Sequence, residues 1–336
     1  MIRPDDRLDS EIQHHLDLLA AQAYLGFSRL RLRNHGIRDG RMLRGQFFGA
    51  TIRRMSRGAK ATPRRIEPQF WTNVAHRWEA WESVVMAALA PIDPVLMRTT
   101  GLEVGDRVVD FGCGSGEPSL ALARYVGPKG RVLGVDVSVP MLEVARRRTR
   151  MAQLGNVRFR RGDLAAFRYR GSRFDVAVSR FALMFASDLD TALGNVRDAL
   201  RRGGRAAFAV WGSLEQNPSI AIRARLRRHF DPGPVPDPET IPHPLRLARP
   251  GRLAGLMRRA GFEEVREEGV HAGTTFGSLD DCVRMQSEVA MCDLYDTLSP
   301  ARRQALRGGL RRGFNRFRER GIVRVPGFAL VVSGRR

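Results

Sequence analysis

Three alternating glycines are the feature of this sequence with the clearest chemical meaning. The stretch 108–123 reads VVDFGCGSGEPSLALA, in which an apolar run ends at Asp110 and Gly112, Gly114 and Gly116 follow. A strand, a glycine turn and a helix in this order bring backbone N–H groups and a helix N-terminus against a ligand. Glycine allows the backbone to approach that ligand more closely than any side chain would permit. The stretch therefore predicts a ligand-binding turn.

The spacing of the glycines separates two classes of ligand. The turn that binds dinucleotides has glycines at G-x-G-x-x-G. Here the spacing is G-x-G-x-G, and Glu117 stands three residues after Gly114. A carboxylate at that place would repel a pyrophosphate, and Asp110 just before the turn suits a cationic ligand better. A nicotinamide or flavin cofactor is therefore disfavoured.

Four motifs taken together point to a family. The runs DFGCGSG, VLGVDVS, RGDL and VSRFALMF resemble those of the class I S-adenosylmethionine-dependent methyltransferases, and within them the ubiquinone/menaquinone-type small-molecule methyltransferases. The resemblance covers about residues 66–336. It implies an enzyme that moves a methyl group from S-adenosylmethionine to a small molecule and leaves S-adenosylhomocysteine, with no metal.

The resemblance also implies roles for single residues. Asp110 would hold the ammonium group of the methionine moiety, directly or through water. Asp136 lies 20 residues after Gly116, where a carboxylate is expected to accept hydrogen bonds from both ribose hydroxyls. Asp163 would bond the adenine amino group, with Leu164 donating its backbone N–H. The predicted cofactor-binding set is Asp110, Gly112, Cys113, Gly114, Gly116, Asp136, Val137, Met141, Asp163, Leu164, Ser179 and Arg180.

Several of these residues have a purely structural alternative. Asp136 could cap a helix, and Asp163 could be a surface acid in a loop; for both, cofactor contact is favoured. For Met141, packing on the adenine or ribose and ordinary core packing stay equally open. Arg180 could border the cofactor or serve as a structural ion-pair partner, and that choice is also open.

Alternating strand and helix patterns must position these residues. They predict a doubly wound, Rossmann-like α/β fold with a mostly parallel seven-stranded sheet and a last strand, 328–333, inserted antiparallel. The earlier strands are expected at 107–110, 131–136, 157–160, 174–179 and 205–211, and the helices between them at 118–126, 140–154 and 189–200. A further helix that stops at Gly261 is expected to lead into an edge strand. Gly155 and Gly203 are predicted helix stops.

Segments outside this core are expected to form the acceptor side. A Trp-rich helix begins at Phe70, the segment 213–250 contains a proline-rich loop, and the segment 278–320 is predicted to be two helices broken at Ser299–Pro300. The last two are interpreted as substrate-side caps. Side chains that could line the pocket are Trp71, Trp78, Phe181, Met184, Phe185 and Met291.

The acceptor is predicted by what the fourth motif lacks. Amino methyltransferases that act on adenine or glutamine carry an N/D/S-P-P-Y run, and the equivalent stretch here is SRFALMF. A carbon or oxygen atom of a small, apolar or aromatic molecule is therefore favoured. The available bases are His76, His243, His271 and Tyr295, each of which is more simply interpreted as structural. No catalytic residue is assigned.

The net charge of +22 raises an alternative, because basic proteins often bind nucleic acid. All but two of the 57 basic residues are arginines, and they are scattered along the chain. This pattern indicates compositional bias as much as phosphate binding, so a nucleic-acid substrate is disfavoured.

Residues 1–65 are predicted to be a basic, loosely ordered extension with one amphipathic helix. Two alternatives stay open: an RNA methyltransferase steered by this arm, and a non-catalytic cofactor-binding module. No apolar run approaches membrane-spanning length, and the start of the chain lacks signal-peptide character. A cytoplasmic protein is expected, and its oligomeric state is left open. The three cysteines show no metal-ligand spacing and are expected to be reduced.

Overall fold

The computed structural model describes residues 68–166, 168, 174–233 and 237–336. The chain divides into two units, Met1–Thr62 and Pro63–Arg336. The predicted N-terminal extension 1–65, with its amphipathic helix, lies outside the described residues. The account below therefore concerns the second unit.

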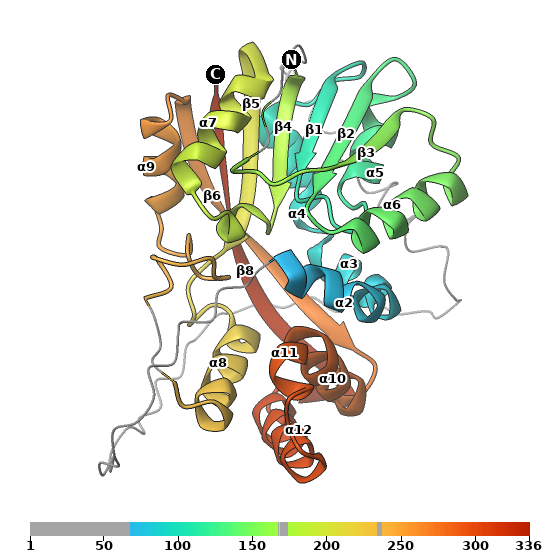
Figure 1. Ribbon diagram of the computed structural model, residues 1–336, viewed down its shortest axis with the longest axis vertical. Helices are drawn as coiled ribbons and strands as arrows, with labels where there is room; N and C mark the ends of the chain where they lie inside the picture. The colour runs from blue at the N-terminus through green and yellow to red at the C-terminus, as the bar shows by residue number, and fades with distance from the viewer. Residues whose placement is uncertain (1–67, 167, 169–173, 234–236) are drawn as a thin grey trace, which may run out of the picture. The chain divides into compact units, whose positions relative to one another are not determined.

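A single mixed sheet forms the centre of this unit (Figure 1). Its spatial order is β3-β2-β1-β4-β5-β8-β6, with β7 paired to β8. Strands β1 to β5 run parallel, and β8 lies antiparallel between β5 and β6. The strands are β1 Arg107–Phe111, β2 Arg131–Asp136, β3 Val157–Arg161, β4 Phe174–Arg180, β5 Leu200–Trp211, β6 Glu263–Phe276, β7 Arg318–Glu319 and β8 Ile322–Arg335.

The predicted fold class is confirmed, including the antiparallel last strand. The sheet has eight strands where seven were predicted. The additional strand is β7, whose two residues pair with the start of β8. Gly321, with φ of 87°, makes the tight turn between them.

Helices flank the sheet and continue beyond one of its ends. They are α2 Pro68–Ala80, α3 Glu82–Leu89, α4 Ile92–Thr100, α5 Ser119–Val126, α6 Val139–Met151, α7 Leu189–Ala199, α8 Pro218–Phe230, α9 Arg252–Arg259, α10 Leu279–Met285, α11 Cys292–Tyr295 and α12 Pro300–Asn315. Leu183–Phe185 forms a 3₁₀ turn and Gln286–Ala290 a π-helical turn. Within the described part of the chain, no helix combines the length and the apolar composition that crossing a membrane requires.

Two predicted elements differ from the structure. The segment 278–320 contains more pieces than the two predicted helices, because a π-helical turn follows α10 and Met291, with φ of −125°, interrupts the helical path before α11. Its last residues form β7 rather than helix. The helix stop predicted at Gly203 is also wrong, because α7 ends at Ala199 and Gly203 lies within β5. The edge strand predicted after Gly261 is β6, which is 14 residues long and pairs with β8 along almost its whole length.

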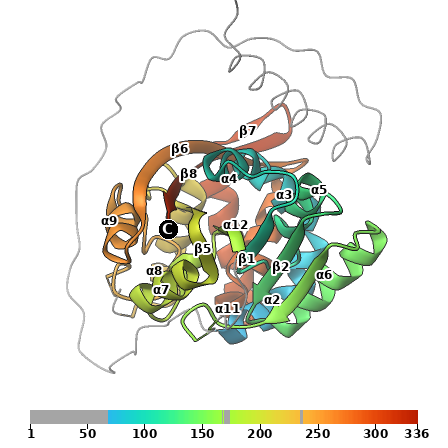
Figure 2. The same cartoon turned by 90° about the horizontal axis from the view of Figure 1, so that it is seen from above.

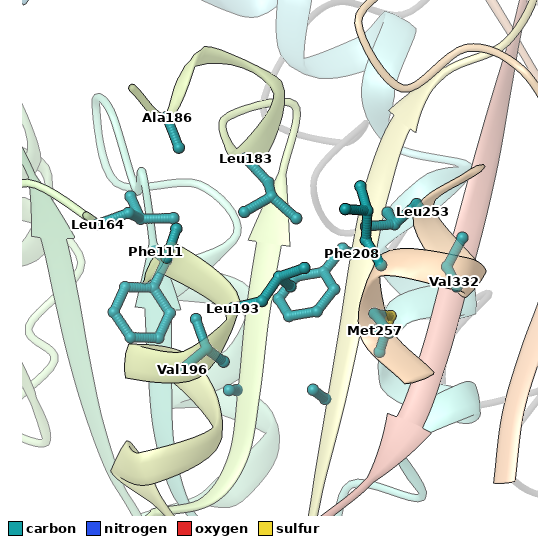
Figure 3. Close-up of a cluster of buried hydrophobic side chains, with 14 of the residues drawn as sticks. Phe111, Leu164, Leu183, Ala186, Leu193, Val196, Phe208, Leu253, Met257 and Val332 are labelled. Atoms are coloured by element: carbon teal, nitrogen blue, oxygen red, sulfur yellow. The ribbon is translucent and has the colours of Figure 1, made fainter. Parts of the chain in front are cut away.

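The core divides between the two faces of the sheet, as the alternation of side chains along β5 requires. Ala206, Phe208 and Val210 face helices α7 and α9 and belong to the larger cluster. Figure 3 shows part of this cluster, including Phe111, Phe208 and Met257. Ala207 and Ala209 face the opposite side, where α4 packs on them. Figure 2 shows α7 and α9 on one side of the sheet and α4 on the other.

Strands β6 and β8 extend past the parallel part of the sheet. Trp211, the last residue of β5, pairs with Ala329, whereas β6 and β8 continue together as far as the pair Phe276 and Val323. Helices α8 and α10 to α12 lie beside this extension, below the sheet in Figure 1. Helix α2 lies between these helices and the carboxyl ends of the parallel strands. The extension therefore places a second, mostly apolar cluster opposite those strand ends.

Candidate active site

A cavity of about 360 Å³ lies where the parallel strands end. Residues that directly follow β1, β2, β3 and β4 line it, which is the usual ligand position in an open α/β sheet. The rest of its wall comes from α2, α3, α8, the π-helical turn and the β6–β8 extension. Of the predicted cofactor set, the residues that line the cavity are Gly112, Cys113, Gly114, Asp136, Val137, Met141, Asp163, Leu164 and Arg180.

The three glycines of the turn all have positive φ, but their surroundings differ. A Cβ on Gly112 would lie 2.0 Å from the Cβ of Ala182, and one on Gly116 would lie 2.8 Å from Leu120. A Cβ on Gly114 would meet no protein atom within 4 Å. Gly112 and Gly116 therefore permit packing, whereas Gly114 leaves open space beside the cavity. Gly116 does not line the cavity, so its predicted cofactor contact is replaced by a packing role.

The turn is held from outside by Arg148 of α6. Its guanidinium donates to the carbonyl oxygen of Ser115 at 2.9 Å and to the Glu117 carboxylate at 3.1 Å, and it forms an ion pair with Glu82 at 2.9 Å. Because this side chain is largely buried, solvent screens these bonds less than it would at the surface. Arg148 thus fixes the shape of the turn.

Asp136 presents its carboxylate at the cavity wall. One oxygen accepts from the Gly114 N–H and the other from the Ser138 N–H, both at 2.9 Å. Burial raises the pKa of this carboxyl, and the backbone hydrogen bonds oppose that rise. Each carboxylate oxygen can accept more than one hydrogen bond. Asp136 therefore retains acceptor capacity for a pair of hydroxyl groups, and its bond to Gly114 couples it to the glycine turn.

Asp110 lies beneath the turn and does not line the cavity. Its side chain is fully buried, and Oδ2 accepts a hydrogen bond from the Ser119 hydroxyl at 2.5 Å. Oδ1 is buried and has no hydrogen-bond partner among the described residues. Burial raises the pKa of Asp110 to about 7. The predicted direct contact with a ligand ammonium is not supported by this position, which leaves the predicted contact through water.

The loop after β3 carries Asp163 and Leu164, and both line the cavity. The Asp163 carboxylate accepts from the Ala165 N–H at 2.7 Å. Asn195 of α7 donates from one side-chain nitrogen to the carbonyl oxygens of Leu164 and Ala165, at 2.9 and 3.1 Å. Asn195 is buried, so these bonds fix the loop relative to α7.

Arg180 both lines the cavity and forms an ion pair. Its guanidinium donates to the two carboxylate oxygens of Asp93 at 2.8 Å each, and to the carbonyl oxygen of Glu117 at 3.1 Å. The ion-pair interpretation is therefore confirmed, and contact with the cofactor stays a prediction. Ser179, next to it in β4, is fully buried and does not line the cavity. Its side chain faces the sheet packing because side chains alternate along a strand.

Aromatic side chains form much of the acceptor side. The rings of Trp71 and Trp78 meet edge to face at 6.2 Å, and Phe185 lies 5.3 Å from Trp71. Phe181 stacks on Trp211 with ring centroids 3.9 Å apart. Trp211, which no sequence motif singles out, reaches the cavity because β5 ends there.

Two predicted wall residues do not line the cavity. Met184 has no exposed surface and packs in the larger core. Met291 is 1% exposed and packs in the cap cluster. Both pack inward because the turns that carry them direct these side chains away from the cavity. Phe70 lines the cavity although it was identified only as the start of the Trp-rich helix.

None of the four candidate bases lines the cavity formed by the described residues. His76 is exposed on α2, and His271 packs edge to face on Phe328. His243 accepts the Leu245 N–H on Nδ1, and burial lowers its pKa. Tyr295 lies beneath the guanidinium groups of two arginines. The structural interpretation of these residues is the one their surroundings support.

Comparison with known proteins identifies the central domain. Residues 102–230 match the model of a methyltransferase domain family. The 2-phytyl-1,4-naphtoquinone methyltransferase of Synechococcus elongatus is 38% identical over 113 residues, which are 33% of this chain and 48% of that protein. The demethylmenaquinone methyltransferase of Staphylococcus aureus is 34% identical over 109 residues, 32% of this chain and 44% of that protein. The chain thus spans about half the length of the curated relatives it matches.

A solved structure supports the fold alone. The [4+2]-cyclase SpnF matches with a TM-score of 0.50 at 18% identity, covering 83% of this chain and 99% of that one. The predicted resemblance to class I methyltransferases is therefore confirmed, in fold by this likeness and in domain family by the match over residues 102–230.

Proposed function

We propose that this chain, which carries a methyltransferase domain, transfers a methyl group from S-adenosylmethionine to a carbon or oxygen atom of a small, apolar molecule. One observation carries the proposal: a single cavity joins the glycine turn, Asp136 and Asp163 to a wall of aromatic side chains. A cofactor at the turn and an acceptor against the aromatic wall would then share one cavity. A shared cavity favours a transfer step because it holds and orients the two reactants side by side.

The residues of the turn fit such a cofactor. Asp136 has acceptor capacity for the ribose hydroxyls, and the space beside Gly114 admits the amino-acid part. Asp110 lies beneath the glycine turn, and its Oδ1 has no hydrogen-bond partner among the described residues. When this carboxylate is ionised, it would attract an ammonium group at the turn. Asp163 and Leu164 line the same cavity, and we expect them to contact the adenine ring. When bound, the sulfonium of the cofactor supplies a methyl group that is already activated.

The acceptor side supports an apolar molecule. Trp71, Trp78 and Phe185 offer ring faces and edges, and Val289, Ala290 and Val325 complete an apolar wall. No histidine or tyrosine among the described residues lines this cavity. A base is needed only when the nucleophile keeps its proton near neutral pH. This wall therefore favours an acceptor whose reacting carbon or oxygen is already electron-rich, so that no histidine or tyrosine is needed to remove a proton from it.

The named relatives support the same class of acceptor, because both act on naphthoquinone-type or menaquinone-type molecules by name. The arginines give little support to a nucleic-acid substrate. Many of those in the described part of the chain form ion pairs with carboxylates, among them Arg77, Arg98 and Arg147. Paired arginines are less available to bind phosphate groups.

The first test is calorimetric titration of S-adenosylhomocysteine into the purified chain. We expect micromolar binding, lost or strongly weakened in Asp136→Ala and retained in Glu103→Ala, which removes an exposed acid remote from the turn. Transfer is then tested with methyl-labelled cofactor and a panel of phenols, naphthols and quinols. Failure of the folded wild-type chain to bind S-adenosylhomocysteine would contradict the proposal, and binding without transfer to any acceptor would leave a cofactor-binding module.

A further inference from the structure

The cavity contains two arginines, and they differ in how their charge is balanced. Arg180 has a bidentate ion pair with Asp93. Arg223 of α8 has no ion pair with any carboxylate among the described residues, and its hydrogen-bond partners, Ser219 and Gln286, are neutral. Cations removed from water are normally paired, because an isolated buried charge is costly. Arg223 therefore stands out as a cation held at the cavity wall with its counter-charge missing from the described residues.

The surroundings of Arg223 hold it in place without neutralising it. One terminal nitrogen donates to the Ser219 hydroxyl at 2.7 Å and to the side-chain oxygen of Gln286 at 2.6 Å. Ser219 and Gln286 also line the cavity. These two bonds occupy one nitrogen of a planar group that has five N–H donors. The remaining donors are available to a ligand.

Gln286 reaches Arg223 from an unusual piece of backbone. It is the first residue of the π-helical turn Gln286–Ala290, which directly follows α10. Such turns are rare and occur frequently at functional sites. The turn brings Gln286, Val289 and Ala290 to the cavity wall together. The π-helical turn thus brings the polar side chain of Gln286 to the cavity wall beside the apolar Val289 and Ala290.

The protonation of Arg223 also follows from its surroundings. Burial and the nearby Arg227 lower its pKa to about 10, which still leaves it charged at neutral pH. Arg227 itself is neutralised by Asp293, with two hydrogen bonds at 2.7 and 2.9 Å. His243, whose pKa burial lowers, adds no negative charge. Of these groups, Arg223 is therefore the positive charge that no described carboxylate balances.

From this geometry we infer that Arg223 binds an anionic oxygen of the methyl acceptor, so that the acceptor is an apolar molecule carrying one ionised acidic group such as a carboxylate, enolate or phenolate. The inference rests on the proposed function, because it assigns the substrate class of that same cavity. Ser219 and Gln286 fix the guanidinium, the aromatic wall contacts the apolar body, and the acid is paired by Arg223. An ionised acceptor also accounts for a cavity without a histidine or tyrosine base among its described lining residues.

The test compares carboxylates with neutral molecules of the same shape. Three pairs serve as probes: phenylacetate with 2-phenylethanol, 1-naphthoate with 1-naphthalenemethanol, and decanoate with decanol. Binding is measured by tryptophan fluorescence and calorimetry, with and without saturating S-adenosylhomocysteine. Since a hydrogen bond to a charged group contributes about tenfold to a hundredfold in affinity, we expect at least one carboxylate to bind tenfold or more tightly than its alcohol.

The variants separate recognition from structure. Arg223→Gln should abolish the preference for the carboxylate and leave the affinity for the alcohol nearly unchanged, whereas Arg223→Lys should retain part of the preference. Arg227→Gln is the matched control, because this neighbour is already paired and does not line the cavity. A merely structural Arg223 would weaken both members of a pair equally in Arg223→Gln.

Two results would overturn the inference: no carboxylate binds better than its alcohol to the wild type, or the preference survives in Arg223→Gln. Failure of the proposed function gives a different pattern, because the wild type then does not bind S-adenosylhomocysteine at all. Arg223→Gln should bind S-adenosylhomocysteine as the wild type does, since Arg223 contacts none of the residues of the glycine turn.

Discussion

At the scale of single residues, some side chains of the site have both a structural role and a proposed role in binding. Asp136 fixes the glycine turn through Gly114 and also faces the cavity, so one carboxylate supports both the local structure and the proposed ribose contact. Asp110 is the opposite case, because it is buried behind the turn and does not line the cavity. Substitutions of these residues can therefore change the free energy of unfolding, the affinity for the cofactor, or both.

Asp136 is expected to determine cofactor affinity. Because hydrogen bonds to a charged group contribute about 1.5–3 kcal/mol each, Asp136→Ala should weaken S-adenosylhomocysteine binding by about tenfold to hundredfold or more. Asp136→Asn keeps the shape but turns one acceptor oxygen into an NH2 donor that faces a backbone N–H, so it should both lower the free energy of unfolding and bind the cofactor less tightly. Calorimetry measures the affinities, and thermal unfolding shows whether the variants are folded.

The glycines Gly112 and Gly114 should respond differently to alanine. Both have positive φ, which costs a non-glycine residue about 1–2 kcal/mol. Gly112→Ala adds a clash with Ala182 and should lower the free energy of unfolding by a further ~1–3 kcal/mol. Gly114→Ala meets no protein atom, so it should remain folded but lose S-adenosylhomocysteine binding. Equal binding by Gly114→Ala and the wild type would show that the cofactor does not approach this turn.

Asp110 should make cofactor affinity depend on pH. Its pKa in the free protein is about 7, and a nearby ammonium group favours the ionised carboxylate. Affinity for S-adenosylhomocysteine should therefore rise as the pH increases from 6 to 8, and Asp110→Asn should remove this rise. Calorimetry at several pH values, corrected for buffer ionisation, measures it. A profile that is flat in the wild type would contradict the proposed role.

The same group affects stability with the opposite sign. A carboxyl whose pKa is higher in the folded than in the unfolded protein binds its proton more tightly when folded. Its contribution to the free energy of unfolding is therefore full below about pH 4 and is lost as the pH rises to about 7. Asp110→Asn should flatten this part of the stability profile of the unliganded protein.

At the scale of elements, strand ends and the helices behind them position the site. The loop after β3 has no regular structure, and buried Asn195 of α7 fixes it through two carbonyl oxygens. At the other end of the sheet, buried Asn156 makes an equivalent pair of bonds to the carbonyl oxygens of Ala123 and Gly127, at 2.7 and 2.8 Å. The two asparagines are alike in burial and bonding but differ in their distance from the cavity.

These asparagines form a matched pair of variants. Each alanine substitution removes two side-chain hydrogen bonds to carbonyl oxygens, one buried and one partly buried, so both should lower the free energy of unfolding by about 1–3 kcal/mol. Only Asn195→Ala should also weaken S-adenosylhomocysteine binding, because only its loop carries Asp163 and Leu164. Denaturant unfolding and calorimetry measure the two effects. Equal affinity in both variants would remove the loop from the site.

At the scale of the whole molecule, the lining residues that the structure describes lie between Phe70 and Gly327, within the unit Pro63–Arg336. Deleting residues 1–62 should therefore leave the affinity for S-adenosylhomocysteine unchanged. If the N-terminal arm steers an RNA substrate instead, the deletion should abolish RNA binding and methyl transfer together. Filter binding with labelled RNA and the transfer assay distinguish the two outcomes.

The sequence alone determined the parts of the site that depend on local chain order. The glycine turn, the acids after β2 and β3 and the sheet topology follow from hydrophobic periodicity and from residues that stand next to strand ends, and both are local properties. For this reason most of the predicted cofactor set lines the cavity. The exceptions are Asp110, Gly116 and Ser179, which stand next to strand ends as predicted but do not line the cavity.

Only the tertiary structure decided the acceptor side, because it forms from segments far apart in the chain. Arg223 is one of 55 arginines, and nothing near it in sequence marks it out. Its role becomes visible when Gln286, from the π-helical turn, is brought to it and when no described carboxylate is. The same holds for Trp211 and for the β6–β8 extension, since long-range pairing sets where each strand ends. Charge balance and enclosure are properties of such contacts, and a local sequence pattern does not contain them.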